Sequence, residues 1–147
     1  MKRALAWVLV VLAHPACGRG VTDPWIDVAI VTVGTEFTVV LESVAIPYLI
    51  GNLSSETTYH IPGRGCGIPD LRVDQRLDGQ WVEYTRPPSG PCPAIYGSGD
   101  VILAPFETYE GEIGLSAPGV FRLRFPVSVR GDPDSERDDT SNPFLVR

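Results

Sequence analysis

A chain of 147 residues has room for one domain and a short targeting segment. Hydrophobic residues make up 44% of it, which supports a packed core and excludes global disorder. The net charge of −6 argues against a nucleic-acid partner, which needs a basic surface. The 14 prolines and 15 glycines are scattered without a repeat, a pattern that favours short strands joined by turns over long helices.

Residues 1–16 are expected to be a signal peptide. Lys2 and Arg3 form a basic start, and residues 4–13 are an apolar run too short to span a hydrocarbon core of roughly 30 Å. The run leads to Cys17, which follows a small residue as in a bacterial lipobox, where cleavage leaves an acylated cysteine. We therefore expect lipidation of Cys17 and attachment to a membrane.

The lipobox likeness is incomplete, because His14 stands where the bacterial pattern has leucine. Ordinary signal-peptidase cleavage, for instance after Gly18, is the alternative, and the protein would then be secreted. With the anchor, residues 17–24 form a short tether. The folded domain at residues 25–147 then lies in the bacterial cell envelope, facing the periplasm or the cell exterior.

Cys66 and Cys92 are the two cysteines that remain in the folded domain. An even pair in an oxidising compartment predicts a disulfide. In the chain-entropy model such a bond would stabilise the fold by about 3–4 kcal/mol. Neither cysteine lies in a Cys-x-x-Cys motif or near a usable histidine, so a metal site is disfavoured.

The domain reads as short strands in chain order. Alternating polarity over residues 36–44 predicts a strand with one buried face, and Pro47 should place the next apolar run at a sheet edge or a bulge. Residues 85–98 and 130–142 are expected to be loops, the first rich in proline and the second charged. Strand-like runs lie at residues 25–33, 36–44, 45–53, 57–61, 71–84, 100–103, 106–115, 121–127 and 143–146.

No segment of the mature chain shows the apolar stripe of an amphipathic helix. Seven to nine short strands with turns at short intervals predict an all-β fold, a single antiparallel β-sandwich.

The strongest local signal is the hairpin at residues 71–84, which turns at Asp78-Gly79. A two-residue turn would place Trp81 opposite Arg76 on a polar face, partly exposed and stacked on the arginine. A three-residue bulged turn would shift the register by one and direct Trp81 into the core, which is the register that we prefer. An exposed Trp81 with Tyr84 and Arg76 would be a candidate binding surface.

Several motifs occur together: a cysteine at the end of the signal peptide, Cys66-Gly67, the run 76–82, Cys92, the run 118–123 and the last strand at 141–144. Together they resemble small bacterial envelope lipoproteins with an immunoglobulin-like β-sandwich and, more distantly, BsuPI-type proteinase-inhibitor domains. The resemblance covers most of residues 35–147 and implies an immunoglobulin-like fold without catalytic residues. Phe121 is a departure, because such domains often carry a tyrosine there whose hydroxyl makes a corner bond.

An acidic cluster is the best candidate for a ligand site. Ca²⁺ needs six to eight oxygens, and acids at alternate positions of a loop can supply some of them. The spacing of an EF-hand is absent, so we expect a solvated loop and no metal, with a weak calcium site as the alternative. The acids are Asp132, Asp134, Glu136, Asp138 and Asp139.

No catalytic arrangement stands out. A Ser-His-Asp site would have to use His60, which lies in a short strand without a nucleophile motif nearby. We therefore expect no cofactor and no enzymatic activity, and instead an envelope-anchored module that binds or supports an unknown envelope protein or glycan. One alternative is a proteinase-inhibitor-like module that binds through residues 85–98. Another is a weak calcium-binding, adhesion-type domain.

Overall fold

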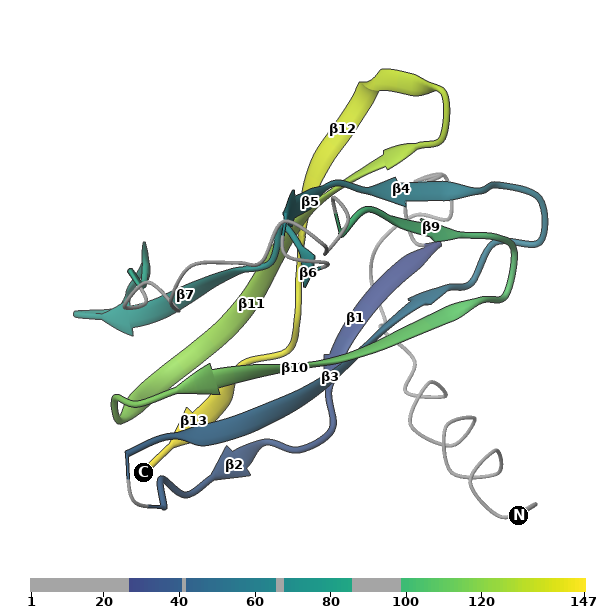
Figure 1. Ribbon diagram of the computed structural model, residues 1–147. Coiled ribbons are helices and arrows are strands. Elements are labelled where there is room, and N and C mark those ends of the chain that lie inside the picture. The colour runs from purple at the N-terminus through teal and green to yellow at the C-terminus, as the bar shows by residue number, and fades with distance from the viewer. Residues whose placement is uncertain (1–26, 41, 66–67, 86–98) are drawn as a thin grey trace, which may run out of the picture.

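The computed structural model describes residues 27–40, 42–65, 68–85 and 99–147, and within these ranges the backbone forms strands and no helix. The all-β prediction is therefore confirmed. The strands form two layers around one core (Figure 1). In chain order they are β1 (Val28–Thr32), β2 (Glu36–Phe37), β3 (Val44–Asn52), β4 (Tyr59–Ile61), β5 (Gly63–Gly65), β6 (Ile68–Pro69), β7 (Arg72–Leu77), β8 (Gln80–Glu83), β9 (Val101–Leu103), β10 (Thr108–Leu115), β11 (Gly119–Val129), β12 (Asp132–Thr140) and β13 (Phe144–Val146).

The first sheet has the order β1-β3-β10, with both pairs antiparallel. Ile46, Tyr48 and Ile50 of β3 are buried, because successive side chains of a strand point to opposite faces and these three share the inner one. β10 adds Ile113 and Leu115 to the same face. This sheet therefore presents an apolar face to the second layer.

Pro47 lies in β3, the central strand, so the predicted position at a sheet edge or a bulge is wrong. The Pro47 carbonyl accepts a hydrogen bond from the Val33 N–H at 3.0 Å, on the β1 side. The nitrogen of a strand residue faces the same neighbour as its carbonyl, so the missing N–H also faces that side. Regular pairing with β1 ends at Tyr48, and the proline therefore removes no bond to β10.

β11 is the centre of the second sheet, which confirms the strand predicted at residues 121–127. On one side it pairs with β13 and β12, and on the other with β7 and β4. β7 pairs further with β8, and β4 with β9. The pairing is antiparallel except between β2 and β13, which run parallel.

β4 and β7 follow the same side of β11 and are separated by an excursion of residues 63–69, which contains the β5–β6 pair. The excursion closes where the Asp70 N–H donates to the Pro62 carbonyl at 2.7 Å. Arg64 and Arg72 donate hydrogen bonds to the Asp70 carboxylate. Burial alone would raise the pKa of Asp70, but these hydrogen bonds outweigh it and lower the pKa below its ordinary value.

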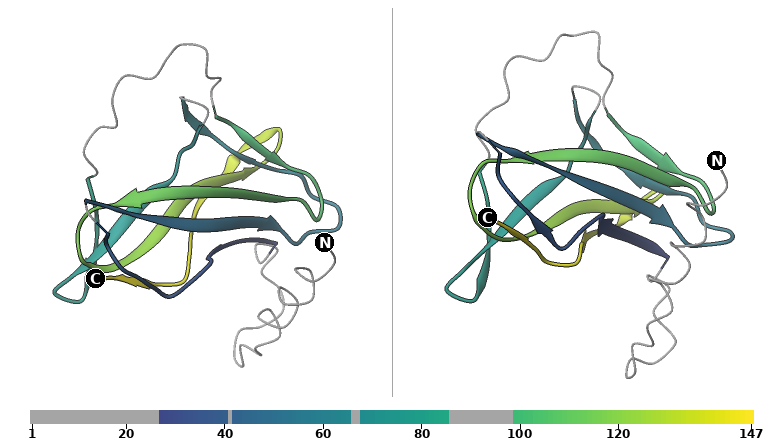
Figure 2. Two further views of the ribbon diagram at one scale, coloured as in Figure 1. Left: turned by 60° about the horizontal axis from the view of Figure 1, so that its bottom comes forward. Right: turned by 90° about the horizontal axis from the view of Figure 1, so that it is seen from below.

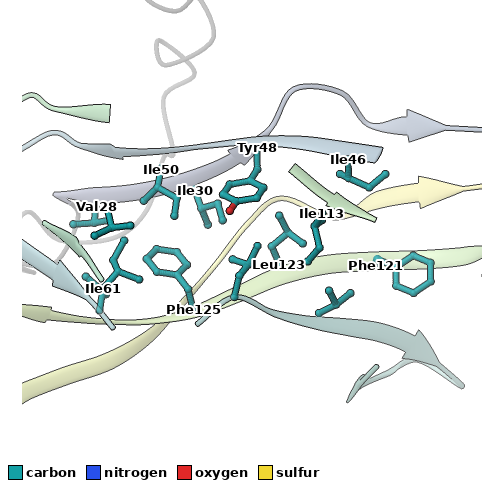
Figure 3. Close-up of a cluster of buried hydrophobic side chains, with 14 of the residues drawn as sticks. Val28, Ile30, Ile46, Tyr48, Ile50, Ile61, Ile113, Phe121, Leu123 and Phe125 are labelled. Carbon is teal, nitrogen blue, oxygen red and sulfur yellow. The ribbon is translucent and has the colours of Figure 1, made fainter. Parts of the chain in front are cut away.

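The core lies between the two sheets. Leu123 and Phe125 of β11 lie across from Ile30 and Ile50 of the first sheet (Figure 3). All four side chains are at most 4% exposed, so they contribute the full hydrophobic stabilisation of their area. Phe121 is also fully buried, in the position where the resemblance suggested a tyrosine.

The strand order matches the immunoglobulin arrangement, in which strands A, B and E form one sheet and C, F and G the other. β1, β3 and β10 take the places of A, B and E. β11 takes the place of F, flanked by β4 with β7 as C and by β12 with β13 as G. The predicted sandwich is therefore confirmed. It has more strands than expected because the places of C and G are each taken by two strands.

Besides the position of Pro47, two further expectations about local structure are wrong. The strand predicted at residues 36–44 is limited to β2, because Phe37 packs on Phe144 and the chain then turns, through a bridge between Val40 and Ser43, to begin β3. The loop predicted at residues 130–142 is mostly β12, whose backbone pairs with β11 while its charged side chains remain on the outside.

The sandwich has two distinct ends, at the left and right of Figure 1. At the hairpin end, β7 and β8 extend outward. At the Phe106 end, the β3–β4 connection (residues 53–58) and the β9–β10 connection (residues 104–107) lie side by side (Figure 2). The described chain begins at this second end, because the Leu53 N–H donates to the Asp27 carbonyl.

Candidate functional site

The β7–β8 hairpin turns at Asp78 and Gly79, whose φ angles of 50° and 82° are both positive, as in a type I′ turn. This two-residue turn pairs Arg76 with Trp81 and confirms the predicted hairpin. The preferred bulged register is wrong, so Trp81 does not join the core. Aspartate and glycine both tolerate the left-handed region, which removes the need for a bulge.

The tip of the hairpin extends past the sheet, because β11 pairs with β7 only as far as Gln75 (Figure 1). Leu77 and Val82 lie on the face that would continue the core, and they are 49% and 47% exposed. Arg76 and Trp81 lie on the opposite, polar face. The hairpin therefore offers two accessible faces of different chemistry.

Trp81 stacks with arginines on the polar face. The Arg122 Cζ lies 4.6 Å from the centroid of the ring and the Arg76 Cζ lies 6.0 Å from it, within the range of a cation–π interaction. The Arg122 Nε donates to Asp74 Oδ2 at 3.0 Å, which fixes the guanidinium. Trp81 is therefore held half-buried in one orientation.

Arg124 lies beside this stack and is fully paired. It donates to Asp74 Oδ1 at 3.2 Å, and at 2.9 Å to both Asp138 Oδ2 and Glu83 Oε2. Burial alone would lower the pKa of Arg124, but the hydrogen bonds to Asp138 and Asp74 raise it. Arg76, in contrast, is exposed and makes no ion pair with any described residue, so its charge is available to a ligand.

Tyr84 does not share the face of Trp81. Its ring packs edge-on against Phe121, with a centroid distance of 5.4 Å, and lies against the core. Side chains three residues apart along extended chain point to opposite faces, so the two rings diverge. Of the predicted surface, Trp81 and Arg76 come together and Tyr84 supports the base of the hairpin.

The acidic residues predicted as a weak calcium site lie on β12. Asp132, Asp134, Glu136 and Asp138 are exposed at alternate positions of the strand, each roughly 7 Å from the next. Within the part of the chain that the structure describes, no group of three or more His, Cys, Asp or Glu side chains could hold a metal ion. Charges along a strand of this kind discourage it from pairing with another chain.

His60 lies on β4 at the surface, where its Nε2 is 3.8 Å from Asp100 Oδ1. The same carboxylate oxygen accepts a hydrogen bond from the Gly63 N–H at 2.6 Å. The pair joins the start of the excursion to the start of β9.

Cys17, Cys66, Cys92 and residues 86–98 lie outside the described residues, so lipidation, the disulfide and binding through the 85–98 loop stay predictions. No helix in the described ranges is both long and apolar enough to cross a membrane.

Sequence reasoning missed three residues of the site. Leu77 directly precedes the turn and Val82 lies three residues after it. Their closeness to the tip of the hairpin could have indicated exposure, although the end of the β7–β11 pairing at Gln75 could not be read from the sequence. Arg122 alternates with buried residues in its strand, which predicts an outward side chain but gives no sign of its contact with Trp81.

The strand order and the hairpin define an immunoglobulin-like β-sandwich with a projecting hairpin. No protein-family model matches the chain, and no curated protein matches it. Among solved structures, it is similar to the CARDB domain of a Pyrococcus furiosus protein, with 12% identity over 82% of this chain and 94% of that chain, and a TM-score of 0.36. It is also similar to the N-terminal domain of PorA, with 13% identity over 82% and 97% of the two chains and a TM-score of 0.36. These values mark a distant likeness, and the fold assignment rests on the strand order.

Proposed function

We propose that this protein is a non-enzymatic, lipid-anchored protein of the bacterial envelope that binds a protein partner through its β7–β8 hairpin. The observation that carries the proposal is the exposure of Leu77 and Val82 on one face of a projecting hairpin, with Arg76 and Trp81 on the other. Large apolar side chains that gather on an exposed projection are typical of an interaction site.

The hairpin has the composition of an interface centre. Tryptophan and arginine are enriched among the residues that dominate binding energies. Arg122 already holds the Trp81 ring, so little side-chain entropy is lost when a partner covers it. Arg76 adds an unpaired charge at the rim. These features fit a partner surface with an apolar groove beside an acidic group.

The free edge of β8 offers a second mode of contact. The Tyr84 N–H donates to the Val73 carbonyl, so Val82 and Gln80, at alternate positions, are the β8 residues that exchange backbone hydrogen bonds with β7. The backbone groups of Trp81 and Glu83 therefore face away from β7. Within the described chain, β8 has no other strand neighbour. An extended segment of the partner can therefore pair with this edge while its side chains contact the hairpin faces.

The position of the hairpin agrees with an anchored protein. The described chain begins at the Phe106 end, and the hairpin extends from the opposite end (Figure 1). A lipid on Cys17 would therefore hold the Phe106 end near the membrane and direct the hairpin away from it.

A photo-crosslinking residue placed at Leu77 or Val82 in living cells tests the proposal. We expect a discrete protein adduct from both positions and none from Thr108, an exposed control on the first sheet. Trp81→Ala or Arg76→Glu should lower the adduct yield about tenfold, the loss expected for residues at an interface centre.

The variants must keep the fold for this test, and melting temperatures close to that of the parent would show it. Equal labelling from Leu77 and Thr108, or yields that Trp81→Ala leaves unchanged, would contradict binding through the hairpin. An adduct that contains glycan and no peptide would replace the protein partner with a saccharide.

A further inference from the structure

Phe106 occupies a strained and exposed position. Its φ angle is 63°, and its side chain is 71% exposed. The Glu107 N–H donates to the Ala104 carbonyl at 3.0 Å, which closes a β-turn with Pro105 and Phe106 at its centre. A turn with a positive φ at its third position normally has glycine there, so a bulky aromatic residue at this point is an outlier. Such strain at an exposed tip suggests a function for the ring.

A buried asparagine, Asn52, fixes the turn at Pro105 and Phe106 from the core side. Asn52 is 2% exposed, and its Nδ2 lies 2.7 Å from the Thr57 carbonyl oxygen and 3.0 Å from those of Leu103 and Ala104. It therefore joins the β3–β4 and β9–β10 connections. Phe106 is held outward by the fold and does not depend on a flexible loop.

A second exposed apolar side chain lies at the same end. Leu53 is 43% exposed, and it directly follows Asn52, whose N–H donates to the Glu107 carbonyl at 2.9 Å. The Leu53 N–H donates in turn to the Asp27 carbonyl. The start of the described chain, Leu53 and the Phe106 turn are therefore neighbours.

We infer that Phe106, with Leu53 beside it, inserts into the interface of the membrane that carries the anchor. This inference rests on the lipidation of Cys17 that belongs to the proposed function. Ten residue steps separate Cys17 from Asp27, so the chain can extend at most about 35 Å between them. A tether of this length keeps the Phe106 end close to the lipid surface, where one aromatic side chain adds to the attachment that the lipid supplies.

The charges at this end favour a neutral lipid surface. Three acidic residues belong to this end: Asp27, whose carbonyl accepts from the Leu53 N–H, Glu56 in the β3–β4 connection, and Glu107, which follows Phe106. The backbone of Arg130 joins the same end through its N–H bond to the Thr58 carbonyl. An anionic membrane would repel the three carboxylates. Contact should therefore be stronger with phosphatidylcholine than with phosphatidylglycerol.

Tryptophan fluorescence in vesicles of brominated phosphatidylcholine tests the insertion. The full lipidated chain would carry Phe106→Trp, Leu53→Trp or, as a control at the hairpin end, the 68% exposed Val40→Trp. We expect quenching for the first two to exceed that of the control by about twofold or more, after subtraction of the parent signal. Leu53→Trp keeps the test valid if the strained position does not accept tryptophan.

Equal quenching for all three variants would overturn the inference. Metabolic lipid labelling, compared with Cys17→Ser, reports on the anchor separately. If labelling is present and quenching is equal, the insertion fails while the anchor stands. If labelling is absent, the three variants of the unlipidated chain are measured with the same vesicles. Stronger quenching at Phe106→Trp than at the control still supports insertion, and equal quenching overturns it.

Discussion

Asp74 brings a carboxylate almost out of contact with water, at 3% exposure. Arg122 and Arg124 compensate its charge from β11, the neighbouring strand. A buried charge without such partners would cost several kcal/mol. Arg122 also holds Trp81 in place, so the stability of the sheet and the shape of the candidate site depend on the same carboxylate.

Asp74→Asn should destabilise the protein by about 2–3 kcal/mol, because it leaves two guanidinium groups without their shared counter-charge. The matched control is Glu83→Gln, which removes a partner of Arg124 that is 56% exposed. An exposed pair contributes less, about 1 kcal/mol at most. Urea unfolding of both variants checks the difference, and equal losses would show that burial does not set the strength of this cluster.

The sequence could predict part of this cluster. Alternation along residues 121–127 places Arg122 and Arg124 away from the core, as observed. It could not predict their contact with Asp74, which is 48 and 50 positions away in the chain, because only the pairing of β7 with β11 brings them together.

At the scale of elements, the β7–β8 hairpin depends on its turn. Gly79 has a φ of 82°, and a Cβ added there would meet no atom within 4 Å. Any effect of a side chain at this position is therefore conformational and not steric. Gly114 in β10 has equally open space without a positive φ, and so provides a matched comparison.

Gly79→Ala should destabilise the protein by about 1 kcal/mol, since alanine resists the left-handed region. Gly114→Ala should be neutral or stabilise by about 0.5 kcal/mol, because it restricts the unfolded chain without strain. Denaturant midpoints of the two variants test this. If both substitutions had the same sign and size, the turn would not be of type I′.

Local signals predicted the elements that depend on local chemistry. Asp78-Gly79 specifies its turn within a few residues, so the hairpin was predictable. β12 was not predictable, because it forms a strand through backbone pairing with β11, and its mostly charged side chains do not show the alternation of apolar and polar residues that indicates a strand. The prediction for Pro47 was wrong for a related reason. The free-energy cost of a proline in a sheet depends on which neighbouring strand the missing N–H faces, and the sequence of one segment does not reveal that neighbour.

At the scale of the whole molecule, the excursion at residues 63–69 is the feature that connects the described fold to the predicted disulfide. Gly99 packs directly on the backbone of Ile68, and the Gly63 N–H binds Asp100. The residues that flank Cys66 therefore lie against the residues that follow the segment containing Cys92. A disulfide needs its two Cα atoms within about 7 Å. The contact of Gly99 with Ile68 is compatible with that distance but does not fix it, because seven residue steps separate Gly99 from Cys92, so the bond stays a prediction.

A reducing agent should lower the melting temperature of the mature domain, with a loss of about 3–4 kcal/mol from opening the loop between Cys66 and Cys92. The test uses a Cys17→Ser background, so that the two cysteines in question are the sole thiols. Cys66→Ser with Cys92→Ser should melt like the reduced protein and be insensitive to reductant. Because the excursion and Gly99 remain packed through Ile68 and Asp100, the reduced domain should still fold. A parent whose melting temperature ignores reductant, and whose thiols react with maleimide before reduction, would show that the cysteines are not bonded.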